Sequence, residues 1–214
     1  MGEVIRGISK RGIPAPKCSP MVREMPRRPL LLLALLVVLS VPAALAPTSA
    51  TATTRATGEQ RDGGFELGVL REVNRLRVAR GLRALTNSSP LQAAAGFQSR
   101  DMIDRGYFDH DQPGGASFGV RLKRFYPAGG SMWQVGENLL WSSQGITPAA
   151  AVKLWLSSPP HRRNLFDPAW RESGIGAIES DTATGAFAEA NGPVVVVTMD
   201  FGTRSSSRTT SAAR

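Results

Sequence analysis

The sequence predicts an α+β domain in which helices cover a sheet. Helical periodicity is found mainly in the first half of the folded region, whereas short, uncharged, β-branched runs are found in the second half. Long connections separate these elements, which is typical of α+β domains. With 214 residues the chain is long enough for one such domain with extensions, and too short for a large multidomain enzyme.

Three amphipathic helices are expected, each with recognisable start or stop signals. In the first, apolar side chains at positions 67, 70, 73 and 76 share one face before a stop at Gly81. The second has Ser88 or Ser89 as its N-cap, Pro90 at its first position and Gly106 as its stop. The third begins at 147–148 and is ended by the prolines at 159 and 160. The short segment 118–125 follows Ser117, which is expected to cap it.

Three strands are expected in the second half. The run 194–199 is β-branched and uncharged, as in a buried central strand. Segment 174–178 is a plausible partner for it across a polar loop, and 135–141 is a candidate third strand.

The net charge of +9 comes from 26 Lys and Arg residues against 17 Asp and Glu residues. Taken alone, this excess would suggest a nucleic acid or a membrane surface as partner. Residues 1–46, however, hold seven basic and two acidic residues, a net +5, which leaves +4 for the rest. The four tryptophans also lack an interleaved basic stripe, so we expect no nucleic-acid partner.

The first 46 residues read as a secretory signal peptide. Arg27 and Arg28 precede the apolar run 30–41, and small residues at 44 and 46 favour cleavage after Ala46. The apolar run is too short to cross a membrane as a helix, so contact with the membrane is expected only during export. A membrane-tethered protein with an uncleaved leader is the alternative. The segment before the apolar run is long for a signal peptide, and a start near Met21 would give one of ordinary length.

The exported chain is expected to have three parts. A flexible linker rich in Thr, Ala and Ser covers 47–64, the folded domain covers 65–202, and a disordered tail covers 203–214. The single cysteine, Cys18, lies before the apolar run, so the exported chain would contain no disulfide. We expect a monomer.

The residues that could carry chemistry are His110, His161 and Glu137. The two histidines are the only ones in the sequence, and both lie just outside expected helices, while Glu137 lies between them in the chain. Two imidazoles and one carboxylate would suit a zinc site with an open position, or a proton-transfer pair. A lone histidine is more often a structural residue, so that interpretation stays open for each.

Four motifs in order resemble the CAP superfamily of cysteine-rich secretory, antigen 5 and pathogenesis-related 1 proteins, and in particular its compact bacterial branch. They are YFDH ending at His110, GENL with Glu137 and Asn138, the run from Trp155 to Gly176, and the closing TMDFG. The resemblance covers nearly all of 65–202. It implies a three-layer α-β-α sandwich with a central antiparallel sheet. It also implies a surface cleft lined by two histidines and by acidic residues.

Carried over residue by residue, the resemblance places His110, Glu137 and His161 in that cleft, and these are the same three residues whose types would suit a zinc ion. The fourth cleft residue of eukaryotic members is a glutamate, and Ser158 stands at its spacing after Trp155. Because a serine is neutral, it cannot replace a carboxylate as a base or as a metal ligand. Asp109 and Asp111, which flank His110, are candidate substitutes.

Two neighbouring residues could support the site. Asn138 follows Glu137 directly, and a structural alternative is that Glu137 accepts backbone N–H bonds and pins a loop there. Arg121, in the expected helical segment 118–125, could pair with an acid near His110.

Three functions follow from these residues. The first is an exported binding module for an apolar or cell-envelope ligand, which the resemblance to lipid- and sterol-binding members suggests. The second is a metal-dependent or acid-base hydrolase with the same three residues. The third is an envelope protein with a structural or interaction role and a vestigial cleft. A G-x-S-x-G pattern at 115–119 is not a nucleophile elbow, because no strand precedes Ser117.

Overall fold

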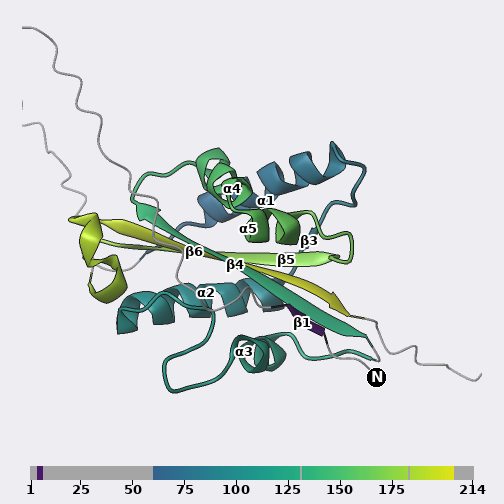
Figure 1. Cartoon of the computed structure of the whole chain (residues 1–214), viewed down its shortest axis with the longest axis horizontal. Coiled ribbons are helices and arrows are strands. Elements are labelled where there is room, and N and C mark those ends of the chain that lie inside the picture. Colours follow the sequence, from purple (N-terminus) through teal and green to yellow (C-terminus); the bar gives the residue numbers. More distant parts are fainter. Residues whose placement is uncertain (1–3, 7–59, 131, 183, 205–214) are drawn as a thin grey trace, which may run out of the picture. The chain divides into compact units, whose positions relative to one another are not determined.

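The computed structural model describes residues 4–6, 60–130, 132–182 and 184–204. The expected cleavage site, nearly all of the expected linker and most of the expected tail therefore lie outside the described residues. All described residues belong to one compact unit, shown in Figure 1.

The elements follow one another along the chain with helices and strands interleaved. In order they are β1 (Val4–Arg6), β2 (Gln60–Arg61), α1 (Gly63–Val78), β3 (Thr86–Asn87), α2 (Ser89–Arg105), α3 (Phe118–Phe125), β4 (Trp133–Ser143), α4 (Pro148–Ser157), α5 (Pro159–Leu165), β5 (Glu172–Ser180), a 3₁₀ helix (Gly185–Ala190) and β6 (Val194–Arg204).

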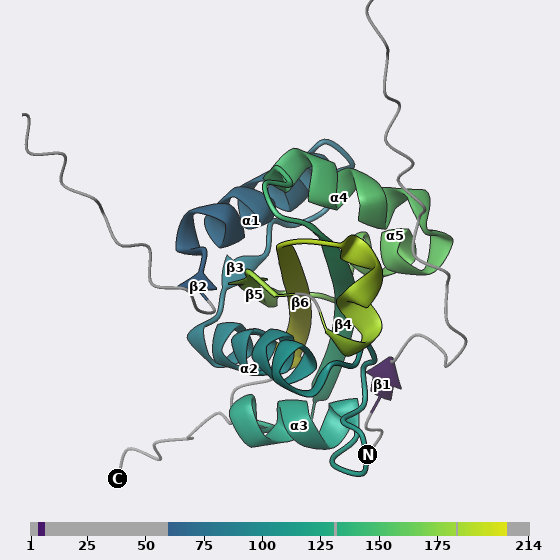
Figure 2. The same cartoon turned by 90° about the vertical axis from the view of Figure 1, so that its left-hand side faces the viewer.

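The sheet has the order β1-β4-β6-β5-β2, and β3 pairs with β5. The long strand β6 lies between β4 and β5 and is antiparallel to both. The short strand β1 pairs in parallel with β4, and the short strand β3 pairs in parallel with β5. Helices α1, α4 and α5 cover one face of the sheet, and α2 and α3 cover the other (Figure 2). The predicted α-β-α sandwich and the central position of 194–199 are confirmed.

Helix α1 begins at Gly63, where the Phe65 N–H donates to the Asp62 carboxylate at 2.9 Å and so caps the helix. The predicted apolar face was wrong at Leu67, whose side chain is 48% exposed. The buried stripe is centred instead on Phe65, Val69 and Val73, because these residues are four apart and face the sheet.

A buried carboxylate ties α1 to the rest of the domain. Glu66 is 2% exposed, and its two oxygens accept hydrogen bonds from the Ala177 N–H of β5 at 3.1 Å and from the Gln92 side chain of α2 at 3.0 Å. One side chain thus links both helical layers through the sheet.

Helix α2 lies directly against β5, backbone to backbone. A Cβ added at Gly174 would meet the Gln92 nitrogen at 2.0 Å, and one added at Gly176 would meet the Gly96 nitrogen at 2.2 Å. The Ser99 hydroxyl uses this closeness to donate to the Gly176 carbonyl at 2.9 Å. The second predicted helix is confirmed, with Ser88 at its N-cap and Gly106 at its end, although the Ser88 side chain makes no capping bond.

Two local expectations need correction. Ser117 precedes α3, but its side chain makes no capping bond, and the Phe118 N–H donates to Asp111 at 2.8 Å instead. The prolines at 159 and 160 do end α4, yet they also begin α5, because proline is well suited to the first turn of a helix.

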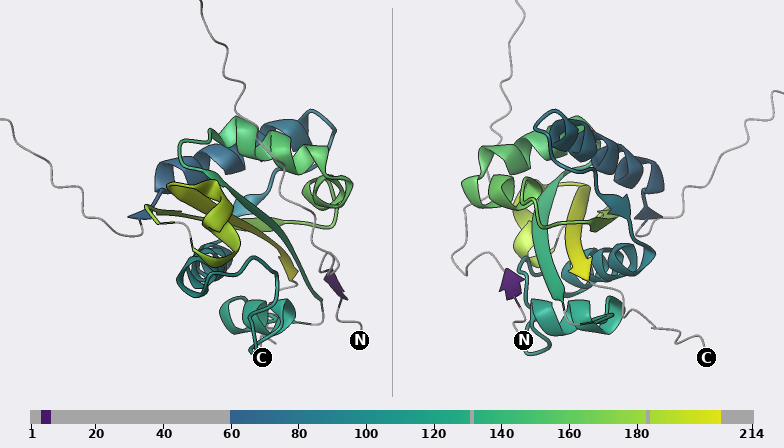
Figure 3. Two further views of the ribbon diagram at one scale, coloured as in Figure 1. Left: turned by 60° about the vertical axis from the view of Figure 1, so that its left-hand side comes forward. Right: turned by 90° about the vertical axis from the view of Figure 1, so that its right-hand side faces the viewer.

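The ends of the domain also differ from the expected limits. Strand β2 and the start of α1 lie within the segment expected to be linker, and β6 runs two residues past Gly202. Strand β1 lies within the expected leader, where it pairs with residues 134–136 of β4. Further views of the domain are given in Figure 3.

Candidate functional site

The centre of the candidate site is the carboxylate of Glu137, which is fully buried on β4. One of its oxygens lies 2.7 Å from the Nδ1 atom of His110. The other accepts a hydrogen bond from the Arg121 guanidinium of α3, whose second nitrogen donates to the His110 carbonyl at 2.9 Å. Arg121 therefore holds both members of the His110–Glu137 pair, which confirms its expected pairing with an acid near His110.

A second buried carboxyl, Asp200, lies beside Glu137. The two residues are opposite each other in the β4–β6 register, so their side chains project from the same face of the sheet. Asp200 is fully buried, and neither of its oxygens has a hydrogen-bond partner among the described residues. Burial and, next, the Glu137 carboxylate raise the pKa of Asp200 well above its usual range, against the opposing effect of Arg121. The protonated, neutral carboxyl is thus favoured.

Sequence reasoning missed Asp200 as a site residue, although it quoted the TMDFG motif that contains it. The available signal was an acidic residue placed directly after an uncharged, β-branched run. A charged side chain in a buried strand needs a partner or a proton, so its position in the sequence indicates a buried, interacting carboxyl.

The imidazole of His110 is fixed through its Nδ1 atom and is partly open to solvent. Its side chain is 19% exposed, and its ring meets the edge of Phe118 at a centroid distance of 6.2 Å. Because Nδ1 faces Glu137, the remaining ring nitrogen, Nε2, is the atom available to a ligand or substrate.

His161 reaches the same region from α5, on the other helical layer. Burial and, to a lesser degree, the nearby charge of His110 lower the pKa of His161 to about 4. Its imidazole is therefore neutral at physiological pH, and it can donate one hydrogen bond and accept another.

Asn138 anchors α5 to β4, and its side-chain hydrogen bonds in the described structure go to α5 and not to His110. Its side chain donates to the His161 carbonyl at 3.2 Å and accepts from Asn164 at 3.0 Å. Asn164 also donates to the Glu137 carbonyl at 3.1 Å. Because Glu137 and Asn138 are consecutive in a strand, they face opposite sides of the sheet, and together they connect the layers that carry the two histidines.

Ser158, at the position of the fourth acid, and the candidate substitute Asp111 differ in their surroundings. The Ser158 hydroxyl is buried and has no hydrogen-bond partner among the described residues. Asp111 accepts the Phe118 N–H at the start of α3, which gives it a capping role. Asp200 is the acid that the fold places beside Glu137.

The zinc site expected from His110, Glu137 and His161 finds no support in the geometry. Both Glu137 oxygens are already engaged, by His110 and by Arg121. Within 60–204, apart from positions 131 and 183, no group of three or more His, Cys, Asp or Glu side chains is arranged to hold a metal ion.

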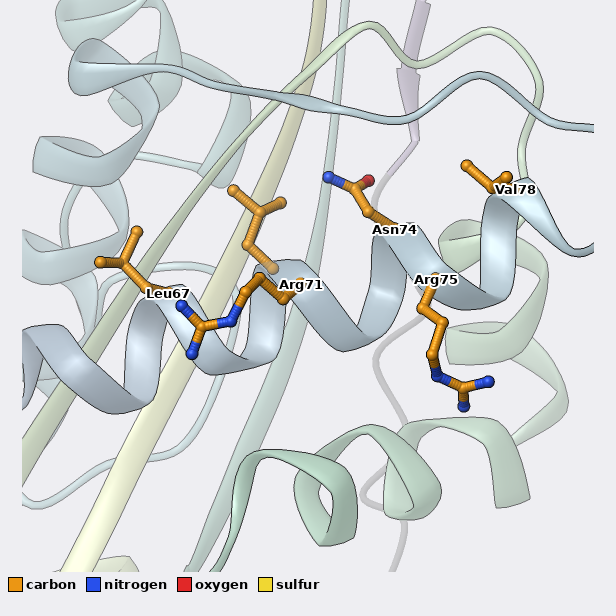
Figure 4. A pocket seen from close by; sticks show the side chains of 6 residues that line it. Leu67, Arg71, Asn74, Arg75 and Val78 are labelled. Atoms are coloured by element: carbon orange, nitrogen blue, oxygen red, sulfur yellow. The ribbon is translucent and has the colours of Figure 1, made fainter.

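Two surface hollows lie elsewhere on the domain. One, of about 470 Å³, runs along α1 beside Leu67, Leu70, Arg71, Asn74, Arg75 and Val78. All of these except Leu70 are labelled along the helix in Figure 4. The other, of about 690 Å³, lies at the end of α5. Neither is lined by His110, Glu137 or His161.

Comparison with known proteins identifies the family. The sequence model of the cysteine-rich secretory protein family (CAP) matches residues 70–201, well over half of the chain, and this range includes all the site residues above. The chain belongs to the CAP family. Its resemblance in sequence motifs is thereby confirmed, and its described part is a CAP domain.

Two curated relatives come from Bacillus subtilis (strain 168). The uncharacterized protein YkwD is 33% identical over 116 residues, which cover 54% of this chain and 43% of YkwD. The uncharacterized membrane protein YlbC is 31% identical over 111 residues, which cover 52% of this chain and 31% of YlbC. The chain thus spans less than half the length of these relatives.

Solved structures show the same fold. An extracellular protein with an SCP domain from Bacillus anthracis has a TM-score of 0.51 and 26% identity, over 66% of this chain and 41% of that one. An outer surface protein from Borrelia burgdorferi has a TM-score of 0.52 and 17% identity, over 69% of this chain and all of that one. In the described part of this CAP domain, no helix is long and apolar enough to cross a membrane.

Proposed function

We propose that this CAP domain is exported and acts as a binding module for a cell-envelope ligand, which it holds through the imidazoles of His110 and His161. The observation that carries the proposal is the engagement of both Glu137 oxygens. Because Glu137 is fully buried and bonded to Arg121, it fixes the His110 ring and leaves only Nε2 for a ligand.

The chemistry of the site favours a polar group of that ligand, such as a hydroxyl. His161 is neutral, and its ring offers one donor and one acceptor in the region of the partly exposed His110 side chain. An extracellular place of action is supported by the solved relative from B. anthracis, which is an extracellular protein.

Native mass spectrometry of the protein collected from the culture medium tests the proposal. We expect an added organic mass in the native spectrum that disappears under denaturing conditions. His110→Gln and His161→Gln should lose it, whereas Asp104→Asn, on the exposed side of α2, should keep it. A bare wild-type chain, or variants that all retain the added mass, would contradict binding at the histidines.

A specific observation also favours an acid-base hydrolase as second candidate. The 2.7 Å contact between Glu137 and His110 Nδ1 is the arrangement that orients an imidazole as a general base, with Nε2 directed at the proton to be removed. Turnover of a substrate that His110→Gln abolishes while the variant remains folded would place this function first.

A further inference from the structure

The hollow at the end of α5 is rich in arginine. Arg80, which follows α1, and Arg162 and Arg163, on α5, line it together with Phe166, Asp167 and Pro168. The Arg80 guanidinium lies over the Phe166 ring, 4.2 Å from its centroid. Three cations from two different elements therefore surround one space of about 690 Å³.

Two of these cations have no internal role in the described structure. The side chains of Arg162 and Arg163 are exposed, and no ion pair or hydrogen bond is found for them among the described residues. One guanidinium nitrogen of Arg80 donates a hydrogen bond to the Leu76 carbonyl at 3.1 Å. Most of the guanidinium N–H groups around the hollow are thus available to a ligand.

The oxygen atoms near the hollow that could accept hydrogen bonds from these arginines are largely bonded to other donors. The carbonyls of Leu165 and Asp167 accept hydrogen bonds from the buried Arg77, at 2.7 and 3.2 Å. One Asp167 carboxylate oxygen accepts the Ala169 N–H at 2.8 Å. Arg77 also places a fourth positive charge behind the wall of the hollow, so the local charge remains positive despite Asp167.

We propose that this hollow binds the phosphate group of an organic phosphate ester, at a site separate from His110 and His161. The planar guanidinium matches the oxygens of a phosphate and forms charge-assisted hydrogen bonds with it. Phe166 and Pro168 supply apolar surface for the organic part of the ester. The inference does not depend on the function proposed for the histidines.

The full-length chain can be tested with two probes that carry the same chemistry. Glycerol 3-phosphate, titrated by calorimetry, represents a free ester, and vesicles of phosphatidylglycerol mixed with phosphatidylcholine represent a lipid headgroup. The test variant is Arg162→Gln with Arg163→Gln. The control is Lys123→Gln with Arg124→Gln, which removes the same charge from α3 and leaves the basic amino-terminal residues unchanged.

We expect the α5 variant to weaken binding at least about tenfold, because each charge-assisted hydrogen bond contributes strongly. The control should change affinity less than about twofold. If the α5 variant weakens the binding of both glycerol 3-phosphate and the vesicles, the ligand is a free ester. If it weakens the binding of the vesicles alone, the ligand is a lipid headgroup. Arg80→Gln provides a second variant and should weaken binding in the same way.

Two results would overturn the inference. Equal losses in the α5 variant and the α3 control would show a response to net charge alone. An absence of binding of both probes to the wild-type chain at low ionic strength, where screening is weakest, would show that the hollow takes no phosphate. Circular dichroism of each variant verifies that the fold is retained.

Discussion

At the scale of single residues, Arg121 is the cation that stabilises the buried carboxyl groups of Glu137 and Asp200. It is 2% exposed and bonds to Glu137, whose other partner in the described structure is the His110 imidazole. Arg121→Met should lower the free energy of unfolding by roughly 3 to 5 kcal/mol, because it leaves a buried carboxylate without its counter-charge. Urea unfolding at pH 7 measures this change.

Arg124→Met, on the same helix and exposed, is the matched control and should change the free energy of unfolding by less than about 0.5 kcal/mol. Equal midpoints for the two variants would show that Arg121 does not stabilise Glu137.

His161 should make the stability of the domain sensitive to acid. Its pKa is lowered from 6.5 to about 4 in the folded state, so between these values the unfolded chain binds more protons than the folded one. Stability is then complete above pH 6.5 and decreases as the pH falls toward about 4. Between pH 7 and pH 5 the loss should be about 2 kcal/mol, and His161→Gln should remove most of it.

Urea unfolding of both proteins at the two pH values checks this prediction. If the wild type and His161→Gln lose the same stability between pH 7 and pH 5, the imidazole of His161 is not the group that responds.

The contribution of Asp200 to the free energy of unfolding should change with pH in the opposite direction to that of His161. Because burial and Glu137 raise its pKa, the folded state keeps a proton that the unfolded chain has released above about pH 4. The contribution of Asp200 is therefore present at low pH and is lost as the pH rises through the raised pKa. Asp200→Asn, which is always neutral, should become more stable relative to the wild type between pH 5 and pH 8.

The measurement is the difference in free energy of unfolding between Asp200→Asn and the wild type at those two pH values. A difference that does not change with pH would mean that Asp200 is already ionised in the folded state.

The sequence supplied some of these residues and not others. His110 and Glu137 could be predicted to meet, because rare residue types and family motifs marked them, whereas Arg121 was predicted only from its place in the segment 118–125. Asp200 could not be placed beside Glu137 without the register of β4 on β6, since the two residues are far apart in the chain. The capping role of Asp111 was missed for a similar reason, as the nearer Ser117 offered an ordinary cap.

At the scale of elements, the contact between α2 and β5 should be sensitive to a single methyl group. Gly176→Ala would place a Cβ 2.2 Å from the backbone nitrogen of Gly96, which cannot move without shifting the helix. We expect a loss of about 1 to 3 kcal/mol or more in the free energy of unfolding. Thermal unfolding followed by circular dichroism measures it.

Gly96→Ala is the control, because its added Cβ would meet nothing within 4 Å. In a helix interior this change should be neutral or slightly stabilising. A stable Gly176→Ala protein would show that α2 can lie farther from the sheet than described.

The predictability of the elements depended on how local their signals were. Helices α1 and α2 and strand β6 were predicted because each has its own periodicity and end signals. The second helix of the α4–α5 pair was missed because two prolines after a helix usually signal an end. The short strands β2 and β3 have only two residues each, and their pairing with β5 is set by tertiary structure alone.

At the scale of the whole molecule, the expected export makes a direct prediction about mass. If the leader is cut after Ala46, protein from the medium should begin at Pro47 and should contain no cysteine, because Cys18 is removed. Intact-mass measurement of the secreted protein checks both points. Protein found only in the membrane fraction with residues 1–46 still attached would contradict cleavage and favour the tethered alternative.

The glycine contacts between α2 and β5 also have a mechanical consequence. Where backbone meets backbone at Gly174 and Gly176, no side chain can rearrange to absorb a displacement, so α2 and the sheet should move as one rigid body. One way to widen the space between the two histidines would then be a small rotation of α5 about its junction with α4 at Ser158, which would break the hydrogen bonds that tie α5 to Asn138. The moving arm of this hinge would carry His161 together with Arg162 and Arg163, so it would also shift two of the three arginines of the hollow relative to Arg80.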